Sequence, residues 1–185
     1  MLRAIPFLLA LPLLWASPVA AQEIYGGVYD HEVDTFLSHP INEHGVDVQL
    51  GYRFRAPKAL KIIGSPSPYV FGSFNLQRNT DFIAAGLSWK IGKGPVFVRP
   101  GLGVALHDCP HCGLALTELV RTPANHTREN LGSTVLFEPE IALGMRLSSR
   151  WDAEASWVHL SHAHFFSDIN PGLDVMGVRL TYHLH

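Results

Sequence analysis

Apolar and polar side chains alternate along several segments of the chain, which is the period expected when successive residues of a β-strand point to opposite faces. The segments run from Val46 to Phe54, Ile83 to Ile91, Val96 to Leu106, Val135 to Leu147 and Met176 to Leu184. The polar set of these segments carries charges of both signs beside many small residues. The pattern predicts an antiparallel sheet with one apolar and one charged face.

Either face of such a sheet could meet water. A soluble lipocalin-like barrel turns its apolar face inward, whereas a membrane barrel turns it to hydrocarbon. The segment from Ser133 to Leu147 is too long for an ordinary soluble strand and suits a tilted membrane strand of about 9–11 residues with a projecting end. Aromatic residues near segment ends are typical of an interfacial girdle; they are Tyr52, Trp89, Trp151, Trp157 and Tyr182. We therefore expect the charged face to line the lumen.

The fold class that follows is all-β, an eight-stranded antiparallel transmembrane β-barrel. The strands expected are Glu23–Tyr29, Gly45–Phe54, Pro68–Leu76, Phe82–Ile91, Val96–Leu106, Ser133–Leu147, Trp151–Leu160 and Asp174–Leu184. Connections alternate between short turns and long loops, as in outer-membrane barrels whose short turns face the periplasm. The segment Arg55–Ser67 is longer than such a turn, and the pattern does not explain it.

The N-terminus predicts a secretory signal peptide at residues 1–21, followed by one barrel domain at 22–185. Met1-Leu2-Arg3 is a short positive start, Ala4 to Trp15 is almost wholly apolar, and small residues precede Gln22. The apolar core is shorter than the roughly 20 residues of a helical span, which argues against an anchor. No long apolar run follows, so membrane insertion would be as a multi-pass barrel.

Composition excludes some classes of function. The net charge of −2 and the lack of a basic cluster argue against nucleic-acid binding. Cys109 and Cys112 lie in a polar loop rather than between a strand and a helix, so a local disulfide in an oxidising compartment is favoured over a redox pair. His107 and His111 could join them around zinc, but no second ligand pair has metal-site spacing. We expect neither a metal nor a cofactor.

A candidate for catalysis lies near the C-terminus. His159 and Ser161 are two residues apart, so they share a strand face at about 7 Å and continue the lipid-facing row. Asp174 belongs to the outward row of the next strand. A serine needs a base, and an imidazole works best when a carboxylate fixes its tautomer. Asn170 or backbone N–H groups of the turn could stabilise an oxyanion.

The residues alone leave a second interpretation open, in which His159 and Ser161 mark only the wet rim of a barrel. The run His159-Leu160-Ser161, followed by Asn170-Pro171-Gly172-Leu173-Asp174 and a final strand, resembles the PagL-type lipid A 3-O-deacylases. The segments Gly94–Ala105 and Leu131–Glu138 are also similar to strands of that family, whereas the first half of the chain resembles it only in pattern.

The resemblance implies an eight-stranded outer-membrane barrel with a cofactor-free serine hydrolase site on its outer surface, within the outer leaflet. Such an enzyme removes the ester-linked acyl chain at position 3 of lipid A. Matched residue by residue, Ser161 is the nucleophile, His159 the base, Asp174 the acid, and Asn170 an oxyanion-stabilising group. We therefore expect a lipid A deacylase whose partners are lipopolysaccharide and outer-membrane lipid.

Two departures from the family pattern concern this hairpin. The family's acid is usually glutamate, and it follows the serine at a spacing one residue shorter than here. The spacing from Asn170 to Asp174 matches the family, which favours Asp174 over Asp168 as the acid. His162 stands where asparagine is common, and the roles of His162 and His164 are left open.

Two other functions and the oligomeric state are also left open. The chain could be a non-enzymatic barrel whose long loop around His107–Gly132 binds a surface partner, or an outer-membrane esterase acting on phospholipid. A homodimer is neither indicated nor excluded by the sequence.

Overall fold

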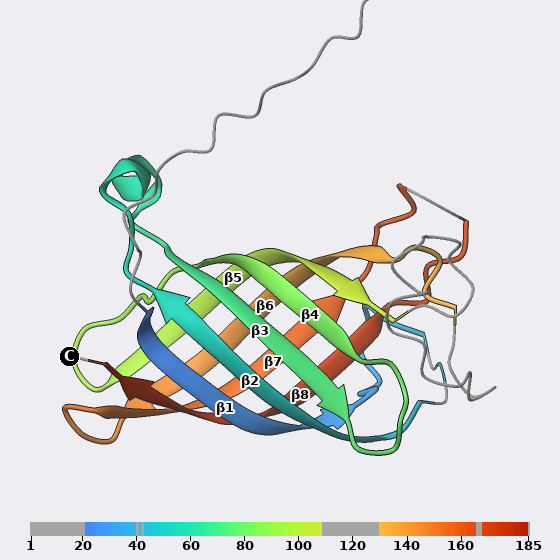
Figure 1. The fold of residues 1–185 in the computed structure, drawn as a ribbon, viewed down its shortest axis with the longest axis horizontal. Coiled ribbons are helices and arrows are strands. Elements are labelled where there is room, and N and C mark those ends of the chain that lie inside the picture. The colour runs from blue at the N-terminus through green and yellow to red at the C-terminus, as the bar shows by residue number, and fades with distance from the viewer. Residues whose placement is uncertain (1–20, 40, 42, 109–129, 166–167, 185) are drawn as a thin grey trace, which may run out of the picture.

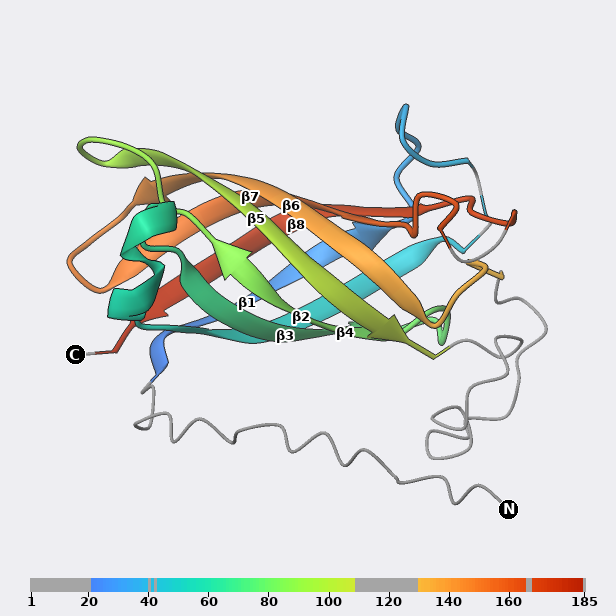
Figure 2. The ribbon, with the colours of Figure 1, turned by 90° about the horizontal axis from the view of Figure 1, so that it is seen from above.

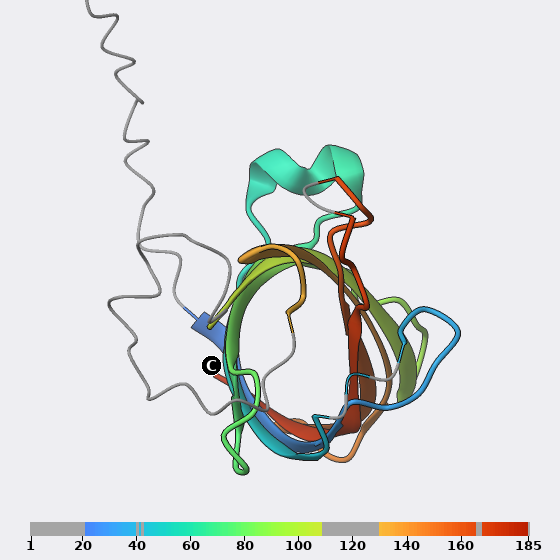
Figure 3. The ribbon, with the colours of Figure 1, turned by 90° about the vertical axis from the view of Figure 1, so that its right-hand side faces the viewer.

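The computed structural model describes residues 21–39, 41, 43–108, 130–165 and 168–184. In this part of the chain, eight antiparallel strands form a closed barrel in which each strand pairs with its sequence neighbours and β1 pairs with β8 (Figure 1). The view along the barrel shows the closed ring (Figure 3). The strands are β1 Ala21–His31, β2 Gly45–Phe54, β3 Ser67–Asn75, β4 Phe82–Ser88, β5 Val96–His107, β6 Val135–Arg146, β7 Trp151–Leu160 and β8 Leu173–His183.

All eight predicted strands are confirmed, including β1 and β3, whose sequence patterns are the weakest. The predicted end of the fourth strand at Ile91 is wrong, because β4 ends at Ser88. Ser88 pairs with Ser67, the first residue of β3, so beyond Ser88 only β5 remains as a neighbour. Ile91 accordingly forms just an isolated pair with Val98.

The unexplained segment between β2 and β3 contains a 3₁₀ helix, η1 Lys58–Ile63, which projects from the barrel end that carries the short turns (Figure 2). Gly64 ends the helix in the left-handed region at φ 89°. The indole of Trp89 donates a hydrogen bond of 2.7 Å to the carbonyl oxygen of Ile63, which ties η1 to the segment after β4. None of the helices in the described residues is long and apolar enough to cross a bilayer.

The charged strand face lines the lumen, as predicted. Glu154 accepts hydrogen bonds from Arg179 Nε at 2.8 Å and from Arg53 Nη2 at 3.3 Å, and Arg99 Nη2 lies 3.4 Å from its other oxygen. All four side chains are buried. Because a buried charge is costly unless paired, this network holds four of the strands around one carboxylate.

The lumen also contains large aromatic side chains; the alternation from Val96 to Leu106 puts Phe97 in the polar set, whereas the sequence pattern did not indicate the others. They include Tyr25, Tyr29, Tyr69, Phe71, Phe82 and Phe97, all buried. Glycines on neighbouring strands make room for these rings: a Cβ on Gly144 would lie 2.2 Å from Cζ of Phe97. Rings and ion pairs therefore share the lumen.

The apolar strand face points outward, as predicted for a membrane barrel, and its side chains are exposed. Exposed members include Leu50, Ile83, Leu102, Leu143, Val178 and Leu180. Trp151 and Tyr182 stack at 4.9 Å near the short-turn end, which fits the girdle expected there.

Some sequence predictions fall on the margins of the described residues. Cys109, Cys112 and His111 lie outside them, as does the signal peptide except for Ala21, which is the first residue of β1. The disulfide and the signal peptide therefore stay predictions.

Candidate functional site

The pairing of β7 with β8 sets the geometry of the candidate site. His159 is directly opposite Asp174 in the register of the two strands. Nδ1 of His159 lies 2.7 Å from Oδ1 of Asp174, and both side chains are buried. Both belong to the outward rows of their strands, with Ala155 and Met176 as exposed neighbours on the same face. The predicted base and acid thus form a hydrogen-bonded pair on the outside of the barrel wall.

Two further side chains donate hydrogen bonds to this carboxylate. Nε1 of Trp157 lies 2.7 Å from Oδ1 of Asp174, and the Thr35 hydroxyl donates to Oδ2. Neither residue was predicted to take part in the site. Trp157 was expected only in an aromatic girdle, and the loop that carries Thr35 has no periodic pattern that would predict its position.

Ser161 follows β7 and remains on the same face as His159. It forms a bridge with Phe137 of β6, in which the N–H of Phe137 donates to Ser161 O at 2.7 Å and the N–H of Ser161 donates to Phe137 O at 3.2 Å. Its side chain is partly exposed. Within the described residues no hydrogen bond joins the Ser161 hydroxyl to the His159 ring, so the serine lies beside the pair without being bonded to it.

Asn170 lies close to the backbone that follows the serine. Its Oδ1 accepts a hydrogen bond of 3.0 Å from the N–H of His162. With Oδ1 engaged in this way, the amide NH₂ is the donor that the side chain can offer to another group. The N–H groups of Ser161 and His162 are both bonded to protein oxygens, so neither has a proton to offer an oxyanion, whereas the NH₂ of Asn170 carries two.

The loop after Ser161 has an unusual backbone. Ala163 and His164 have φ angles of 49° and 59°, in the left-handed region, and the N–H of Phe165 donates to His162 O at 2.9 Å to close the turn. Non-glycine residues in this region are strained, and such strain concentrates at functional sites. The chain therefore reverses direction immediately beside the candidate nucleophile.

The remaining predicted residues have different surroundings. His162 is buried, and its Nε2 lies 2.8 Å from the carbonyl oxygen of Ile169, so its ring holds the two ends of this loop together. The ring of His164 packs edge-on against it at 6.3 Å. Asp168, the alternative acid, is exposed in the loop, and the acid hydrogen-bonded to His159 is Asp174.

The loop between β1 and β2 crosses the outer side of the site, and we call residues 33–39 the strap. The N–H of Val33 donates to Asp174 O at 2.8 Å, and the N–H of His39 donates to Pro171 O at 2.8 Å. Figure 3 shows this blue segment outside the ring of strands, on the side of the red-coloured wall. The strap thus covers the acid from the side opposite to the lumen.

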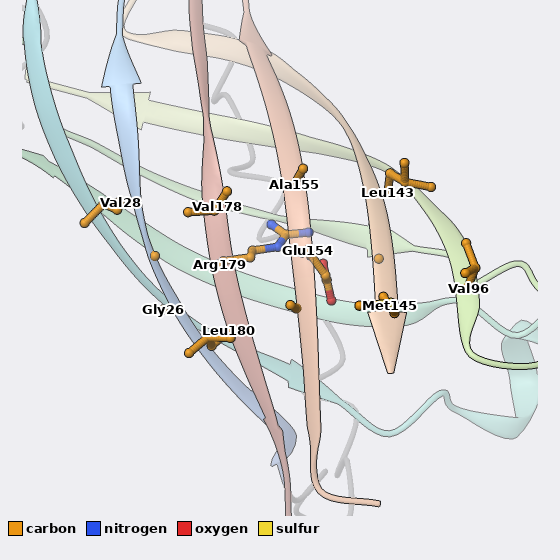
Figure 4. Close-up of a pocket in the computed structure, with 13 residues that line it drawn as sticks. Gly26, Val28, Val96, Leu143, Met145, Glu154, Ala155, Val178, Arg179 and Leu180 are labelled. Atoms are coloured by element: carbon orange, nitrogen blue, oxygen red, sulfur yellow. Dashed lines mark hydrogen bonds and ion pairs between the residues drawn. The ribbon is translucent and has the colours of Figure 1, made fainter. Parts of the chain in front are cut away.

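Two adjoining apolar hollows lie on the outer wall, between the site and the end of the barrel that carries the short turns. The larger has a volume of about 830 Å³ and the smaller about 420 Å³, and both are lined by Leu143 and Ala155. In the larger one, Ala155 of β7 lies between Leu143 and Met145 of β6 and Val178 and Leu180 of β8 (Figure 4). Trp157 lines the smaller hollow at the end nearest to His159. Small side chains on β7 between larger ones on its neighbours produce this shape.

No group of three or more His, Cys, Asp or Glu side chains within the described residues could hold a metal ion. His107, which was considered as a zinc ligand, places its Nε2 2.7 Å from the carbonyl oxygen of Ser133. Its other proposed partners lie outside the described residues.

Comparison with known proteins places this geometry in a family. The model of the lipid A 3-O-deacylase (PagL) family matches residues 42–183. The chain belongs to this family. Among solved structures, the crystal structure of the outer membrane enzyme PagL matches with a TM-score of 0.59 and 14% identity, over 87% of this chain and 99% of that one.

Structures of Ail, an outer membrane protein of Yersinia pestis, match less well. The structure in a phospholipid bilayer nanodisc has a TM-score of 0.45 and 11% identity, covering 88% of this chain and 99% of that one. The crystal structure has a TM-score of 0.37 and 13% identity, covering 89% and 100%. No curated protein matches significantly in sequence.

Family membership and the closed barrel together identify an outer-membrane β-barrel protein of a lipid A deacylase family, so the predicted family and fold class are confirmed. The solved PagL structure supports the fold alone at this level of identity. The roles of Ser161, His159, Asp174 and Asn170 stay predictions.

Proposed function

We propose that this protein hydrolyses the ester that joins the acyl chain to position 3 of lipid A, with Ser161 as the nucleophile. The observation that carries the proposal is the hydrogen bond of 2.7 Å between His159 and Asp174 on the outward face of the wall. A buried His–Asp pair on the outward side of the wall has no structural need that an apolar pair would not meet, because burying polar groups is costly. A base oriented toward membrane lipid is what an ester hydrolase requires.

In the first step, Oγ of Ser161 attacks the ester carbonyl carbon and its proton moves to Nε2 of His159. Asp174 accepts the hydrogen bond from Nδ1–H, which keeps Nε2 unprotonated beforehand and stabilises the imidazolium that forms. The Asn170 amide donates to the oxyanion of the tetrahedral intermediate.

In the second step, the bond from the carbonyl carbon to the position-3 oxygen breaks, and that oxygen takes the proton from His159. An acyl-Ser161 ester remains. Water then attacks this ester with His159 again as the base, and the products are free fatty acid and regenerated Ser161.

The position of the site suits a substrate held in the outer leaflet. Ser161 and His159 lie at the end of the barrel that carries the long loops, while the apolar hollows extend from Trp157 along the wall toward the short-turn end. Acyl chains of a lipid in the same leaflet run in this direction. Low dielectric at the lipid boundary also strengthens the His159–Asp174 hydrogen bond.

The proposal is tested by incubating the purified barrel with lipid A and recording mass spectra of the lipid. We expect the loss of one hydroxyacyl chain with the wild-type protein and no loss with Ser161→Ala or His159→Ala. Ser156→Ala is the matched control, because Ser156 lies on the same strand but is buried on the lumen face. Circular dichroism checks that each variant retains the barrel.

Phospholipid in the same assay separates the two esterase hypotheses. Release of fatty acid from phospholipid but not from lipid A would replace the proposed substrate. Unchanged lipid A and phospholipid spectra with folded wild-type protein would leave the non-enzymatic barrel as the better account.

A further inference from the structure

The carboxylate of Asp174 is held on both of its oxygens. Oδ1 accepts hydrogen bonds from Nδ1 of His159 and from Nε1 of Trp157, each at 2.7 Å. Oδ2 accepts a hydrogen bond from the Thr35 hydroxyl. The Asp174 side chain has no exposed surface, so these protein groups replace water around it.

We propose that Thr35 and Trp157 are positioning residues, which fix the orientation of the Asp174 carboxylate and, through it, the orientation and tautomer of His159. This inference rests on the proposed function and extends it to the strap, which comes from the opposite end of the sequence. Neither residue touches the reacting atoms.

An aspartate carboxylate needs such restraint because its terminal torsion is broad, with no sharp staggered minimum. A single hydrogen bond from His159 would leave the group free to rotate about its Cβ–Cγ bond. Donors on both oxygens fix this torsion, since rotation would break the bond to Trp157 or the bond to Thr35. Oδ1 then remains in line with Nδ1 of His159.

The Thr35 hydroxyl is itself oriented. Its oxygen accepts a hydrogen bond of 3.0 Å from the N–H of Leu37, which directs its own proton toward Asp174. The backbone bonds of Val33 to Asp174 O and of His39 to Pro171 O hold the two ends of the strap against β8. The strap is therefore bonded to both the backbone and the side chain of the acid.

Trp157 is restrained in a similar way. It precedes His159 by two residues on β7, so both rings lie on the outward face. The ring of Phe36, which is 88% exposed, packs edge-on against Trp157 at 6.3 Å.

Gly172 lets the strap approach the site closely. A Cβ at this position would lie 3.1 Å from Cε1 of His159 and 3.3 Å from Leu37 O.

The test uses Thr35→Val, which keeps the shape of the side chain but removes its donor, and Trp157→Phe, which keeps one aromatic ring but removes the N–H donor. Matched controls are Asp34→Asn in the strap, which is exposed, and Trp151→Phe at the other end of the same row of β7. Two rates are measured on the folded barrel: kcat for release of fatty acid from lipid A, and phosphonylation of Ser161 by a fluorophosphonate probe, which needs no lipid.

We expect each donor-removing variant to lower both rates about tenfold, the scale of one hydrogen bond to a charged group, with KM unchanged. Thr35→Ser restores the rates because it restores the hydroxyl, and the two controls leave them unchanged. In an Asp174→Ala background, the same substitutions cost much less, because the carboxylate that they hold is already absent.

Equal losses with and without the Asp174 carboxylate, or a rise in KM at constant kcat, would overturn the positioning roles. The probe separates this outcome from failure of the proposed function. Phosphonylation of Ser161 that depends on Thr35 and Trp157, without release of fatty acid from lipid A, would reject the substrate and keep the positioning residues. A wild-type barrel whose Ser161 does not react with the probe would reject both.

Discussion

Replacing Asp174 by asparagine removes one charge from the site and changes little else in shape. The oxygen of the new amide can occupy either of the two carboxylate oxygen positions. At the Oδ1 position it would face two N–H donors, from His159 and Trp157, whereas at the Oδ2 position it would face the Thr35 hydroxyl, which can donate or accept. An NH₂ group at Oδ1 would oppose both N–H donors, so the amide oxygen settles there and the NH₂ turns to Thr35.

The size of the effect follows from this orientation. His159 keeps its hydrogen bond at Nδ1 and therefore its tautomer, and only the attraction between the carboxylate and the imidazolium of the transition state is lost. Two unit charges about 4 Å apart at an effective dielectric constant of about 20 interact by about 4 kcal/mol, which corresponds to roughly a 10³-fold loss in kcat.

The assay is the initial rate of fatty acid release at saturating lipid A, compared among the wild type, Asp174→Asn and Asp174→Ala. We expect the alanine variant to be slower than the asparagine variant, because it also releases the imidazole from its orientation. A loss in kcat of less than about tenfold in Asp174→Asn would contradict the Coulomb estimate and refute this orientation of the amide. The choice of Asp174 as the acid is refuted if Asp168→Asn abolishes turnover while Asp174→Asn does not.

Three further substitutions test the fold around the site. Glu154→Gln should lower the free energy of unfolding by about 3–5 kcal/mol in urea titrations, because it removes the buried negative charge that Arg53, Arg99 and Arg179 share; an unchanged midpoint would contradict this. Leu102→Arg, at a site 58% exposed near the middle of β5, should cost about 2–4 kcal/mol in bilayers and much more than Leu102→Ala. Gly172→Ala, at φ 75°, should lower kcat by displacing the strap, and full activity would argue against that contact.

Most of the barrel could be predicted because the alternation of apolar and polar side chains is visible within the sequence of each strand. The alternation between Val96 and Leu106 fixes which side chains face lipid whatever the neighbouring strands do, and β5 occupies nearly that range. The end of β4 could not be found in this way. Ile83 to Ile91 alternates without a break, yet the strand stops where its partner β3 begins, which is a property of pairing rather than of the segment.

The candidate site also contains residues that could be predicted from strand alternation and residues that could not. His159 and Asp174 lie on adjacent strands joined by one loop, so parity and order along the chain were enough to predict that they face the same side. Thr35 reaches Asp174 from 139 residues away in the sequence. Loop conformation carries no period, so the strap and the change of Trp157 from girdle residue to hydrogen-bond donor required coordinates.

The side chains of the lumen could be predicted only in part from the sequence. The charged rows predicted the ion pairs around Glu154 in kind, since opposite charges in a narrow barrel must pair. The alternation from Val96 to Leu106 puts Phe97 on the charged face, whereas the ring of Tyr25 was not predicted to lie there, because an aromatic side chain fits either face of a strand by pattern alone. Glycines such as Gly144 decide the matter by leaving space on the neighbouring strand.

The proposed mechanism requires that Ser161 carries the acyl chain as a covalent ester during turnover. This is tested by the mass of the peptide that contains Ser161, measured after a rapid acid quench during turnover of lipid A. We expect a fraction of that peptide to carry one hydroxyacyl group, and we expect no such mass in Ser161→Ala or without lipid A. Lipid A that loses its position-3 chain at the wild-type rate in Ser161→Ala, with no acyl group on the protein, would contradict this mechanism.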